Sequence, residues 1–305
     1  MNKTITILIL IMLIAGCSKK SVNDKKILTV SILPQKFFVE KIVGDKFNVN
    51  VLLPPGVSPH TFEPSPSSLI ELSKSDIYFI IGDLDFEKTW LEKFQSVNPK
   101  LIIKNTSEGV DFITHEEHED EDEENGGHEE SGHSENDSEK HHHSGIDPHI
   151  WMSPKEVKVL CKNILNGMIE IDNENKEFYQ KNFESFENDL EKLDMQIRTI
   201  LDKLENREFI IYHPALGYFA RDYDLEEISI EIDGKEPSPE ALKNIIDTAK
   251  ENEIRTIFIQ KQFDIRLAES IAGEINGKVM QLDPLSGDWI NNMILIARTF
   301  QFEVK

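Results

Sequence analysis

The chain has 305 residues, enough for two ordinary domains once an N-terminal leader is set aside. Hydrophobic residues make up 39% of it, so a full core can form, and its formal net charge is −23. This acidic balance argues against a nucleic-acid partner, because a phosphate backbone is bound by Lys and Arg.

The N-terminus has the features of an export leader. Residues 5–14 form an almost continuous apolar run, which is too short for a membrane span of about 20 residues. Small residues then precede Cys17, an arrangement that resembles the lipobox of prokaryotic lipoproteins. The resemblance implies that residues 1–16 are a signal peptide, that Cys17 carries a lipid and that residues 17–26 are a tether. The alternative is an ordinary secretory leader with an incidental cysteine.

Residues 27–172 are predicted to form an N-terminal lobe in which strands alternate with helices, an order typical of a parallel, doubly wound sheet. Cys161 lies in a helical pattern of apolar residues, so it is predicted to be a buried core residue rather than a ligand. The expected strands are 27–33, 47–53, 77–81 and 101–103, and the expected helices are 35–43, 66–73, 86–94 and one that begins after residue 153, where Ser153 and Glu156 have the spacing of a capping box.

Residues 115–145 interrupt this alternation. They hold 13 acidic residues and one lysine, and they lack the apolar side chains that offset the entropy of ordering, so they are predicted to be a disordered loop. The loop's histidines are candidates for loose binding of a transition metal; the alternative is a solvated insertion, which costs a fold little. These histidines are His115, His118, His128, His133, His141, His142 and His143.

A single long helix is predicted between residues 173 and 206. Its apolar residues are spaced alternately four and three apart from Tyr179 to Leu204, which puts them on one face of a helix about 38 Å long. The alternative is a coiled-coil dimer. Phenylalanines at several of these positions favour packing against globular lobes, and we expect a monomer in which this helix links two lobes.

Residues 207–305 resume the alternation and are predicted to form a C-terminal lobe. The predicted fold is therefore α/β, with two Rossmann-like lobes, each a mainly parallel sheet flanked by helices, joined by the single linking helix. The expected strands are 209–212, 228–232, 256–259 and 279–282, and the expected helices are 216–223, 239–251, 265–275 and 290–302.

Three histidines remain outside the acidic loop: His60, His149 and His213. All three lie beside prolines at the ends of expected elements, and His60 and His213 follow strands in different lobes. Ligands of open α/β sheets bind at the carboxyl ends of strands, so these histidines are predicted to meet between the lobes. Three neutral imidazoles suit Zn²⁺ and leave a fourth position for a carboxylate or a water.

Carboxylates near these histidines are candidates for supporting roles. Asp283 ends an expected strand and is the predicted fourth metal ligand, with a helix or turn cap as the alternative. Glu63 and Asp147 are close to His60 and His149 in sequence. They are predicted to hydrogen-bond a histidine and fix its tautomer, or to act as simple caps.

Taken together, these residues identify a family resemblance that covers residues 27–305. The chain resembles the cluster A-I substrate-binding lipoproteins of metal-importing ABC transporters, and specifically their zinc-specific branch, which also have a lipobox, one linking helix and a His/Asp-rich loop. The segments that carry the resemblance are 59–66, 147–151, 213–219, 259–263 and 282–285.

The resemblance implies metal contact by His60, His149 and His213, with Asp283 as the fourth ligand. Manganese-binding members have a carboxylate where His213 stands, and oxygen ligands suit Mn²⁺ while imidazole suits Zn²⁺. It further implies an extracytoplasmic, lipid-anchored zinc-binding component that delivers Zn²⁺ to a membrane permease, with the acidic loop collecting or sensing zinc.

Two other classes of function are weighed against this one. Three histidines and an aspartate could form a zinc-dependent hydrolase, but the sequence lacks the His-Glu-x-x-His pattern, and no general base is marked beside the ligands. A surface adhesin with a structural zinc site is the other alternative. The expected rigid linking helix and inter-lobe site favour capture and release of a metal over catalysis.

Overall fold

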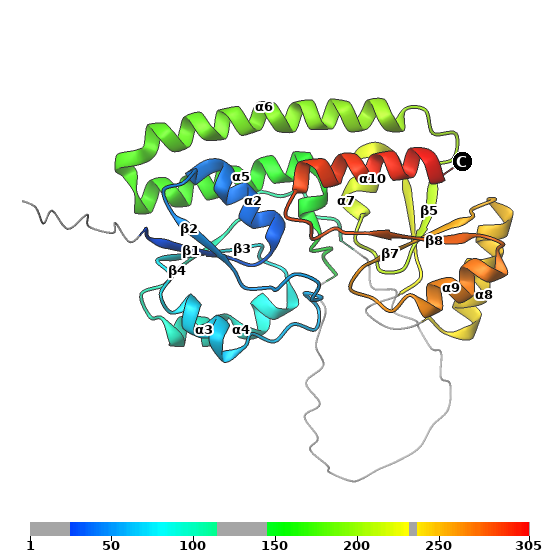
Figure 1. The fold of residues 1–305 in the computed structure, drawn as a ribbon, viewed down its shortest axis with the longest axis horizontal. Helices are drawn as coiled ribbons and strands as arrows, with labels where there is room; N and C mark the ends of the chain where they lie inside the picture. The colour runs from blue at the N-terminus through cyan, green and yellow to red at the C-terminus, as the bar shows by residue number, and fades with distance from the viewer. Residues whose placement is uncertain (1–24, 115–144, 232–236, 305) are drawn as a thin grey trace, which may run out of the picture.

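A computed structural model describes residues 25–114, 145–231 and 237–304. Two four-stranded parallel sheets lie side by side, each between helices, and one long helix runs across both (Figure 1). The predicted two-lobed α/β architecture with a linking helix is confirmed. The predicted leader, Cys17 and almost all of the predicted tether lie outside the described residues.

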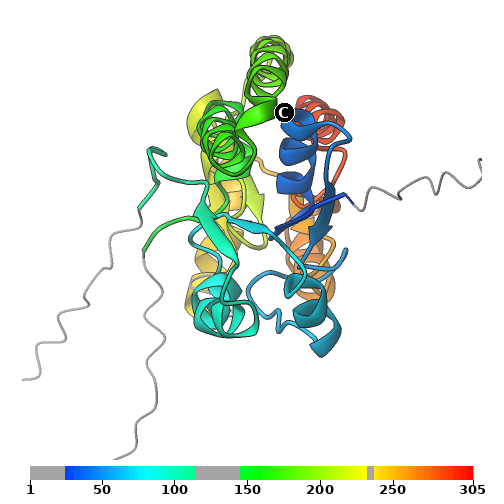
Figure 2. The ribbon, with the colours of Figure 1, turned by 90° about the vertical axis from the view of Figure 1, so that its left-hand side faces the viewer.

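The N-terminal lobe is built on a sheet with the strand order β2-β1-β3-β4, in which every pair is parallel. Helices α2 and α5 lie on one face of this sheet, and α3 and α4 lie on the opposite face (Figures 1 and 2). The elements are β1 (Ile27–Val30), α2 (Leu33–Val43), β2 (Asn48–Val51), α3 (Pro66–Leu72), β3 (Ile77–Ile80), α4 (Asp85–Val97), β4 (Ile102–Asn105), the 3-10 turn η1 (Ile150–Met152) and α5 (Pro154–Ile171).

The C-terminal lobe repeats this plan with the strand order β6-β5-β7-β8. Alternate residues of β5 face opposite ways, as a pleated strand requires: Phe209 and Ile211 pack toward α7 and α10, while Ile210 packs toward α8 and α9. The elements are β5 (Glu208–Ile211), α7 (Gly217–Tyr223), β6 (Glu226–Ser229), α8 (Pro239–Glu251), β7 (Thr256–Gln260), α9 (Arg266–Glu274), β8 (Lys278–Leu282) and α10 (Trp289–Glu303).

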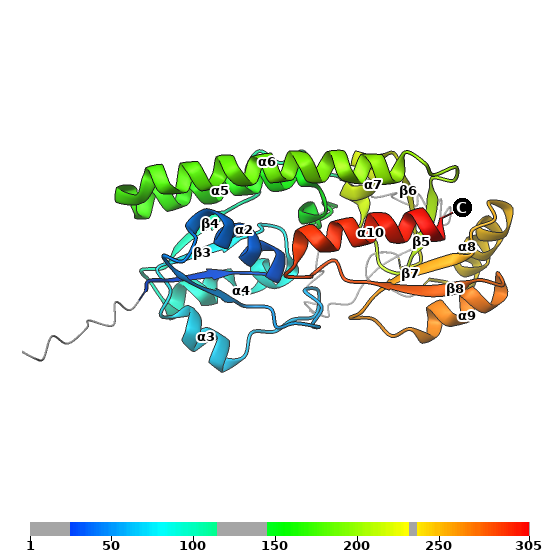
Figure 3. The same cartoon turned by 45° about the horizontal axis from the view of Figure 1, so that its top comes forward.

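The linking helix α6 (Lys176–Leu201) has 26 residues, follows the 3-10 turn η2 (Asn173–Asn175), and is about 39 Å long at 1.5 Å per residue. It packs on α5 and α2 of the first lobe and on α10 of the second, as Figure 3 shows. The predicted apolar face is buried from Tyr179 to Ile197, but near the end of the helix Leu201 is buried and the predicted Ile200 is only half-buried. One hydrophobic core therefore extends through both lobes beneath α6.

Helix α7 fastens the second lobe to the first. The Tyr218 hydroxyl donates to the carbonyl of Asp147 at 2.8 Å and accepts from the backbone N–H of Ile113 at 3.1 Å. The Arg221 guanidinium contacts the carboxylate of Glu156 at 2.7 Å. These contacts cross from one lobe to the other directly behind the segment that carries His149, so they fix that segment against both lobes.

Local sequence signals placed most elements correctly. The Ser153 hydroxyl caps α5 by accepting from the N–H of Glu156, as the spacing predicts. The Glu156 carboxylate does not return to Ser153 but pairs with Arg221. Cys161 is fully buried in α5, as predicted. Strand β6 begins and ends earlier than expected, at Glu226–Ser229, because this edge strand starts with glutamates that the apolar pattern missed.

Across residues 25–114, 145–231 and 237–304, no helix combines the length and the apolar character that crossing a bilayer demands.

Candidate metal centre

His60 lies in the proline-rich loop between β2 and α3. Its Nδ1 atom is 2.9 Å from the Oδ2 atom of Asp85, the first residue of α4. The His60 side chain is 29% exposed, which makes it the most accessible of the three histidines. A carboxylate at Nδ1 holds the proton of a neutral imidazole on that nitrogen, so Nε2 presents its lone pair.

His149 immediately precedes η1, and the carboxylate of Asp147 contacts it at two atoms. The Oδ1 atom of Asp147 accepts from the backbone N–H of His149 at 2.8 Å and lies 2.7 Å from its Nδ1 atom. The other carboxylate oxygen lies close to Gly217: a Cβ at that position would come within 2.7 Å of it. A glycine at the start of α7 therefore lets the second lobe approach the aspartate that orients His149.

His213 follows β5 and is the histidine that the second lobe contributes; its side chain is 10% exposed. Its Nδ1 atom is 2.8 Å from the Oε2 atom of Glu231, and the ring of Phe263 stacks on it with centroids 5.2 Å apart. Burial lowers the pKa of His213 to about 4; Glu231 opposes this shift, and His149 and His60 add to it. The ring is neutral at neutral pH, as a metal ligand must be.

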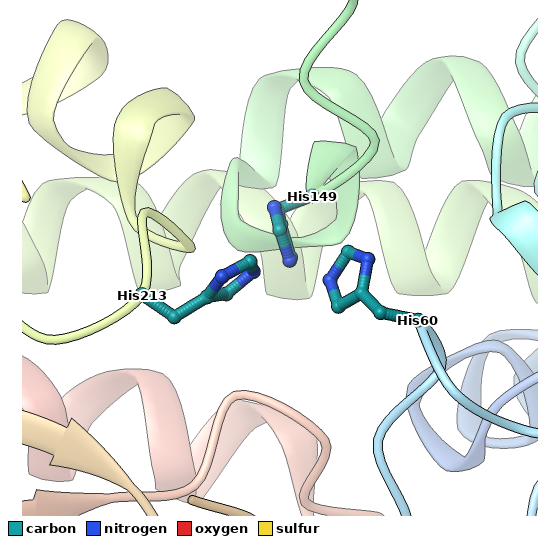
Figure 4. A group of neighbouring side chains, drawn as sticks. All are labelled: His60, His149 and His213. Atoms are coloured by element: carbon teal, nitrogen blue, oxygen red, sulfur yellow. The ribbon is translucent and has the colours of Figure 1, made fainter. Parts of the chain in front are cut away.

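The three imidazoles converge on one point between the lobes (Figure 4). One possible ligand atom from each of His60, His149 and His213 lies within 4.8 Å of the other two. Since a carboxylate faces each Nδ1, the converging atoms are the Nε2 nitrogens. The Nε2 atoms of His60 and His213 are buried and have no hydrogen-bond partner among the described residues.

This donor set fits a tetrahedral Zn²⁺ ion. Zn–N bonds of about 2.0–2.1 Å put the nitrogens about 3.4 Å apart, so small side-chain movements close the cluster around an ion. Buried nitrogens without partners are costly, and an ion accounts for them. The cavity that they line has a volume of about 20 Å³, which suits an ion rather than an organic ligand.

The supporting carboxylates are only partly those predicted. Asp147 contacts His149 as predicted, whereas Glu63 is exposed and the carboxylate at His60 is Asp85. Glu231, which supports His213, was also missed. Asp85 and Glu231 both lie just beyond the carboxyl ends of strands, β3 and β6, so the rule that pointed to the histidines could have identified both.

Asp283 lies outside the histidine cluster. Its carboxylate contacts the Nζ atom of Lys261 at 3.2 Å and lines a neighbouring cavity of about 170 Å³. Backbone contacts fix this turn: Asn292 donates to the carbonyl of Asp283, and Trp151 donates to the carbonyl of Pro284. The predicted lipidation site and the candidate zinc-collecting residues of the acidic loop lie outside the described residues; they are Cys17, His115, His118, His128, His133, His141, His142 and His143.

Comparison with known proteins identifies a family. Residues 28–301 match the family described as "Zinc-uptake complex component A periplasmic". The chain is 32% identical over 288 residues to the high-affinity zinc uptake system protein ZnuA of Bacillus subtilis, which covers 90% of this chain and 86% of that protein. It is 26% identical to the zinc-binding lipoprotein AdcA of Streptococcus pneumoniae, of which the match spans 52%.

Solved structures agree with the sequence relatives. A crystal structure of ZnuA superposes with a TM-score of 0.81 at 37% identity, covering 92% of this chain and all of that one. A ZnuA deletion mutant with zinc bound superposes with a TM-score of 0.80, also at 37% identity, covering 92% of this chain and 99% of that one. The arrangement of the lobes, the histidine cluster and these matches agree, and the chain belongs to the ZnuA family of periplasmic zinc-uptake components.

Proposed function

We propose that this protein is the extracytoplasmic zinc-binding component of a metal ABC importer. It captures Zn²⁺ between its lobes on His60, His149 and His213 and delivers the ion to a membrane permease. The observation that carries the proposal is the convergence of three imidazoles, each with a carboxylate at Nδ1, on one small cavity. Members of the family are zinc-uptake components, which supports it.

The geometry favours reversible binding over catalysis. The carboxylates nearest the cluster, Asp85, Asp147 and Glu231, are each engaged with a ring nitrogen and are not placed to act as a general base. The small cavity leaves little room for an organic substrate. Neither the hydrolase nor the adhesin alternative is favoured by an observation of its own.

Capture requires little movement of the lobes. Because α6 packs along both lobes and α7 fastens the second lobe to the first, a wide hinge would break a continuous core. We propose that Zn²⁺ replaces water on the three Nε2 atoms as the side chains close by about 1 Å, from separations of up to 4.8 Å. The protein acts as a monomer held at the membrane by a lipid on Cys17.

Calorimetric titration with Zn²⁺ tests the metal assignment. The comparison is His213→Ala against its parent, both without residues 115–145, so that the seven histidines of the loop do not mask the result. We expect the high-affinity transition of the parent to disappear in the variant, because two imidazoles remain. Equal affinity in the two chains would refute the site.

A further inference from the structure

Gln260, the last residue of β7, borders the metal cavity from the second lobe. It is 3% exposed and lines the same cavity as His60, His149 and His213. Its backbone carbonyl accepts from the N–H of Phe263, which forms the turn that places the Phe263 ring against His213. Gln260 thus belongs to the structure that surrounds His213, although its residue type does not mark it as a ligand.

The Gln260 amide has a fixed orientation. The Nε2 atom donates to the backbone carbonyl of His213 at 2.6 Å. A carbonyl oxygen can only accept, so the amide nitrogen must be the atom that faces it. The Oε1 atom of Gln260 then points away from that bond, and among the described residues it is buried without a hydrogen-bond partner.

Three buried acceptors around one cavity therefore lack partners: Nε2 of His60, Nε2 of His213 and Oε1 of Gln260. Native proteins leave few such groups, and a cluster of them marks a missing donor. The metal ion accounts for the two nitrogens. It does not by itself account for the amide oxygen, because Zn²⁺ in proteins takes Cys, His and carboxylate ligands rather than neutral amides.

We propose that the Oε1 atom of Gln260 accepts a hydrogen bond from the water that completes the coordination of the captured ion. A water on Zn²⁺ is polarised and is a strong donor, and a fixed neutral acceptor suits it. Gln260 is thus a positioning residue for the fourth ligand. This inference rests on the proposed function, and it identifies that ligand as water while the carboxylate of Asp283 remains with Lys261.

Gln260 has a consequence for release as well as for binding. A carboxylate in the fourth position would add a negative charge to the site and hold a divalent cation more tightly. A water held by a neutral amide adds orientation without charge, so it can leave when the ion is handed over. The site is then three neutral imidazoles and an exchangeable water.

The test uses the full mature chain, with metal added below one equivalent so that the tightest site fills first. Zn²⁺ affinity is measured by competition with a chelator, and the visible absorption of bound Co²⁺ reports its ligands. In Gln260→Leu we expect the dissociation constant for Zn²⁺ to rise about tenfold, as for other residues that support metal ligands, and the Co²⁺ spectrum to change.

Two matched variants distinguish the role of Gln260 as a hydrogen-bond acceptor from a purely structural role. Gln260→Glu keeps an acceptor oxygen, loses the N–H hydrogen bond to the carbonyl of His213 and adds a negative charge, so we expect its Zn²⁺ affinity to equal or exceed that of the parent. An equal loss in Gln260→Leu and Gln260→Glu would assign the effect to that N–H bond and overturn the proposal. Gln262→Leu alters a second glutamine of the cavity lining and is expected to leave the Co²⁺ spectrum unchanged.

An unchanged affinity and spectrum in Gln260→Leu would also overturn the proposal, as would a spectrum altered equally by Gln262→Leu. If Gln260→Leu fails to fold, Gln260→Glu still tests the proposal, because a tenfold loss of Zn²⁺ affinity in that variant contradicts an acceptor role. His213→Ala distinguishes this failure from failure of the proposed function. If His213→Ala retains full affinity, the metal site itself is wrong, whatever Gln260 does.

Discussion

The two lobes each contribute a histidine with a carboxylate at Nδ1, yet they surround it differently. His60 of the first lobe is 29% exposed and its Asp85 is 32% exposed, whereas the side chains of His213 and Glu231 in the second lobe are 10% and 11% exposed. Phe263 also stacks on His213. Under the proposed function, the first lobe would offer an accessible imidazole to an arriving ion, and the second would provide an enclosed imidazole with a fixed orientation.

The largest expected effect comes from changing the fixed histidine into a carboxylate. In His213→Glu we expect Zn²⁺ affinity to fall about a thousandfold and the preference for Mn²⁺ over Zn²⁺ to rise, because oxygen ligands favour the harder ion. The measurement is competition of Mn²⁺ against Zn²⁺ in chains that lack residues 115–145. His60→Glu is the matched control, and its exposed side chain should shift the preference less. An equal shift in both variants would contradict the contrast between the lobes.

Each lobe also contains a carboxylic acid whose pKa is raised by burial, Glu87 in the first and Glu227 in the second, and these two acids should respond differently to pH. Burial raises the pKa of Glu87 to about 7, and burial followed by the charge of Asp147 raises the pKa of Glu227 to about 8. Both acids bind a proton more tightly in the folded protein than in the unfolded chain. Their contribution to stability is therefore complete below about pH 4.5 and is lost as the pH rises through 7 to 8.

Amide substitution separates the two acids. The Oε2 atom of Glu227 accepts from the backbone N–H of Leu216, and its Oε1 atom has no hydrogen-bond partner among the described residues, so Glu227→Gln should raise the free energy of unfolding above pH 8 by about 3 kcal/mol and change it little at pH 5. Glu87 accepts from the backbone N–H groups of Ile81 and Gly82, one on each oxygen, and an amide nitrogen cannot replace both acceptors. Glu87→Gln should therefore destabilise the protein at pH 5 as well. Denaturant unfolding at pH 5 and pH 9 measures the free energy of unfolding of both variants. If Glu87→Gln were more stable than the parent at both pH values, the hydrogen bonds of Glu87 would not be needed for stability.

The carboxylates behind the histidines give the next effect. Glu231→Ala should weaken Zn²⁺ binding about a hundredfold and Asp85→Ala about tenfold, because an enclosed bond orients its ring more strictly than an exposed one. Chelator competition measures both dissociation constants. The essential result is which variant loses more Zn²⁺ affinity. A larger loss in Asp85→Ala than in Glu231→Ala would mean that burial does not determine how much these contacts contribute to binding.

Much of this could be predicted from the sequence because the signals were local. Strand and helix alternation, the spacing from Tyr179 to Leu204, and the capping serine at 153 each depend on residues within a few positions of one another. His60 and His213 were found because ligands of open α/β sheets bind at the carboxyl ends of strands, and His149 because it is the remaining histidine outside the acidic loop. Asp85, Glu231 and Gln260 were missed, since their roles arise from contacts across 18 to 47 positions of sequence.

Metal contact by Asp283 stays a prediction, and this residue gives the smallest expected effect. The residue occurs where the family pattern predicts a fourth ligand, but whether its side chain turns to the metal depends on its neighbours. Here Lys261 lies 3.2 Å from the carboxylate, on the cavity next to the metal site. An ion pair with a 58% exposed lysine is weak, worth about 0–1 kcal/mol, so it directs the carboxylate without locking it.

The substitution Asp283→Asn therefore tests which neighbour controls this carboxylate. If water held by Gln260 is the fourth ligand, Asp283→Asn should leave the dissociation constant for Zn²⁺ within about threefold of the parent, because what it removes is one exposed ion pair. The matched variant is Lys261→Met, which frees the carboxylate of Asp283 without removing it.

Tighter Zn²⁺ binding in Lys261→Met that disappears in the double variant Lys261→Met with Asp283→Asn would show that Asp283 can reach the ion once the lysine is gone. A loss of a hundredfold in Asp283→Asn alone would instead mean that the carboxylate leaves Lys261 for the metal in the wild-type protein, and the second lobe would then contribute charge to the site as well as a fixed imidazole.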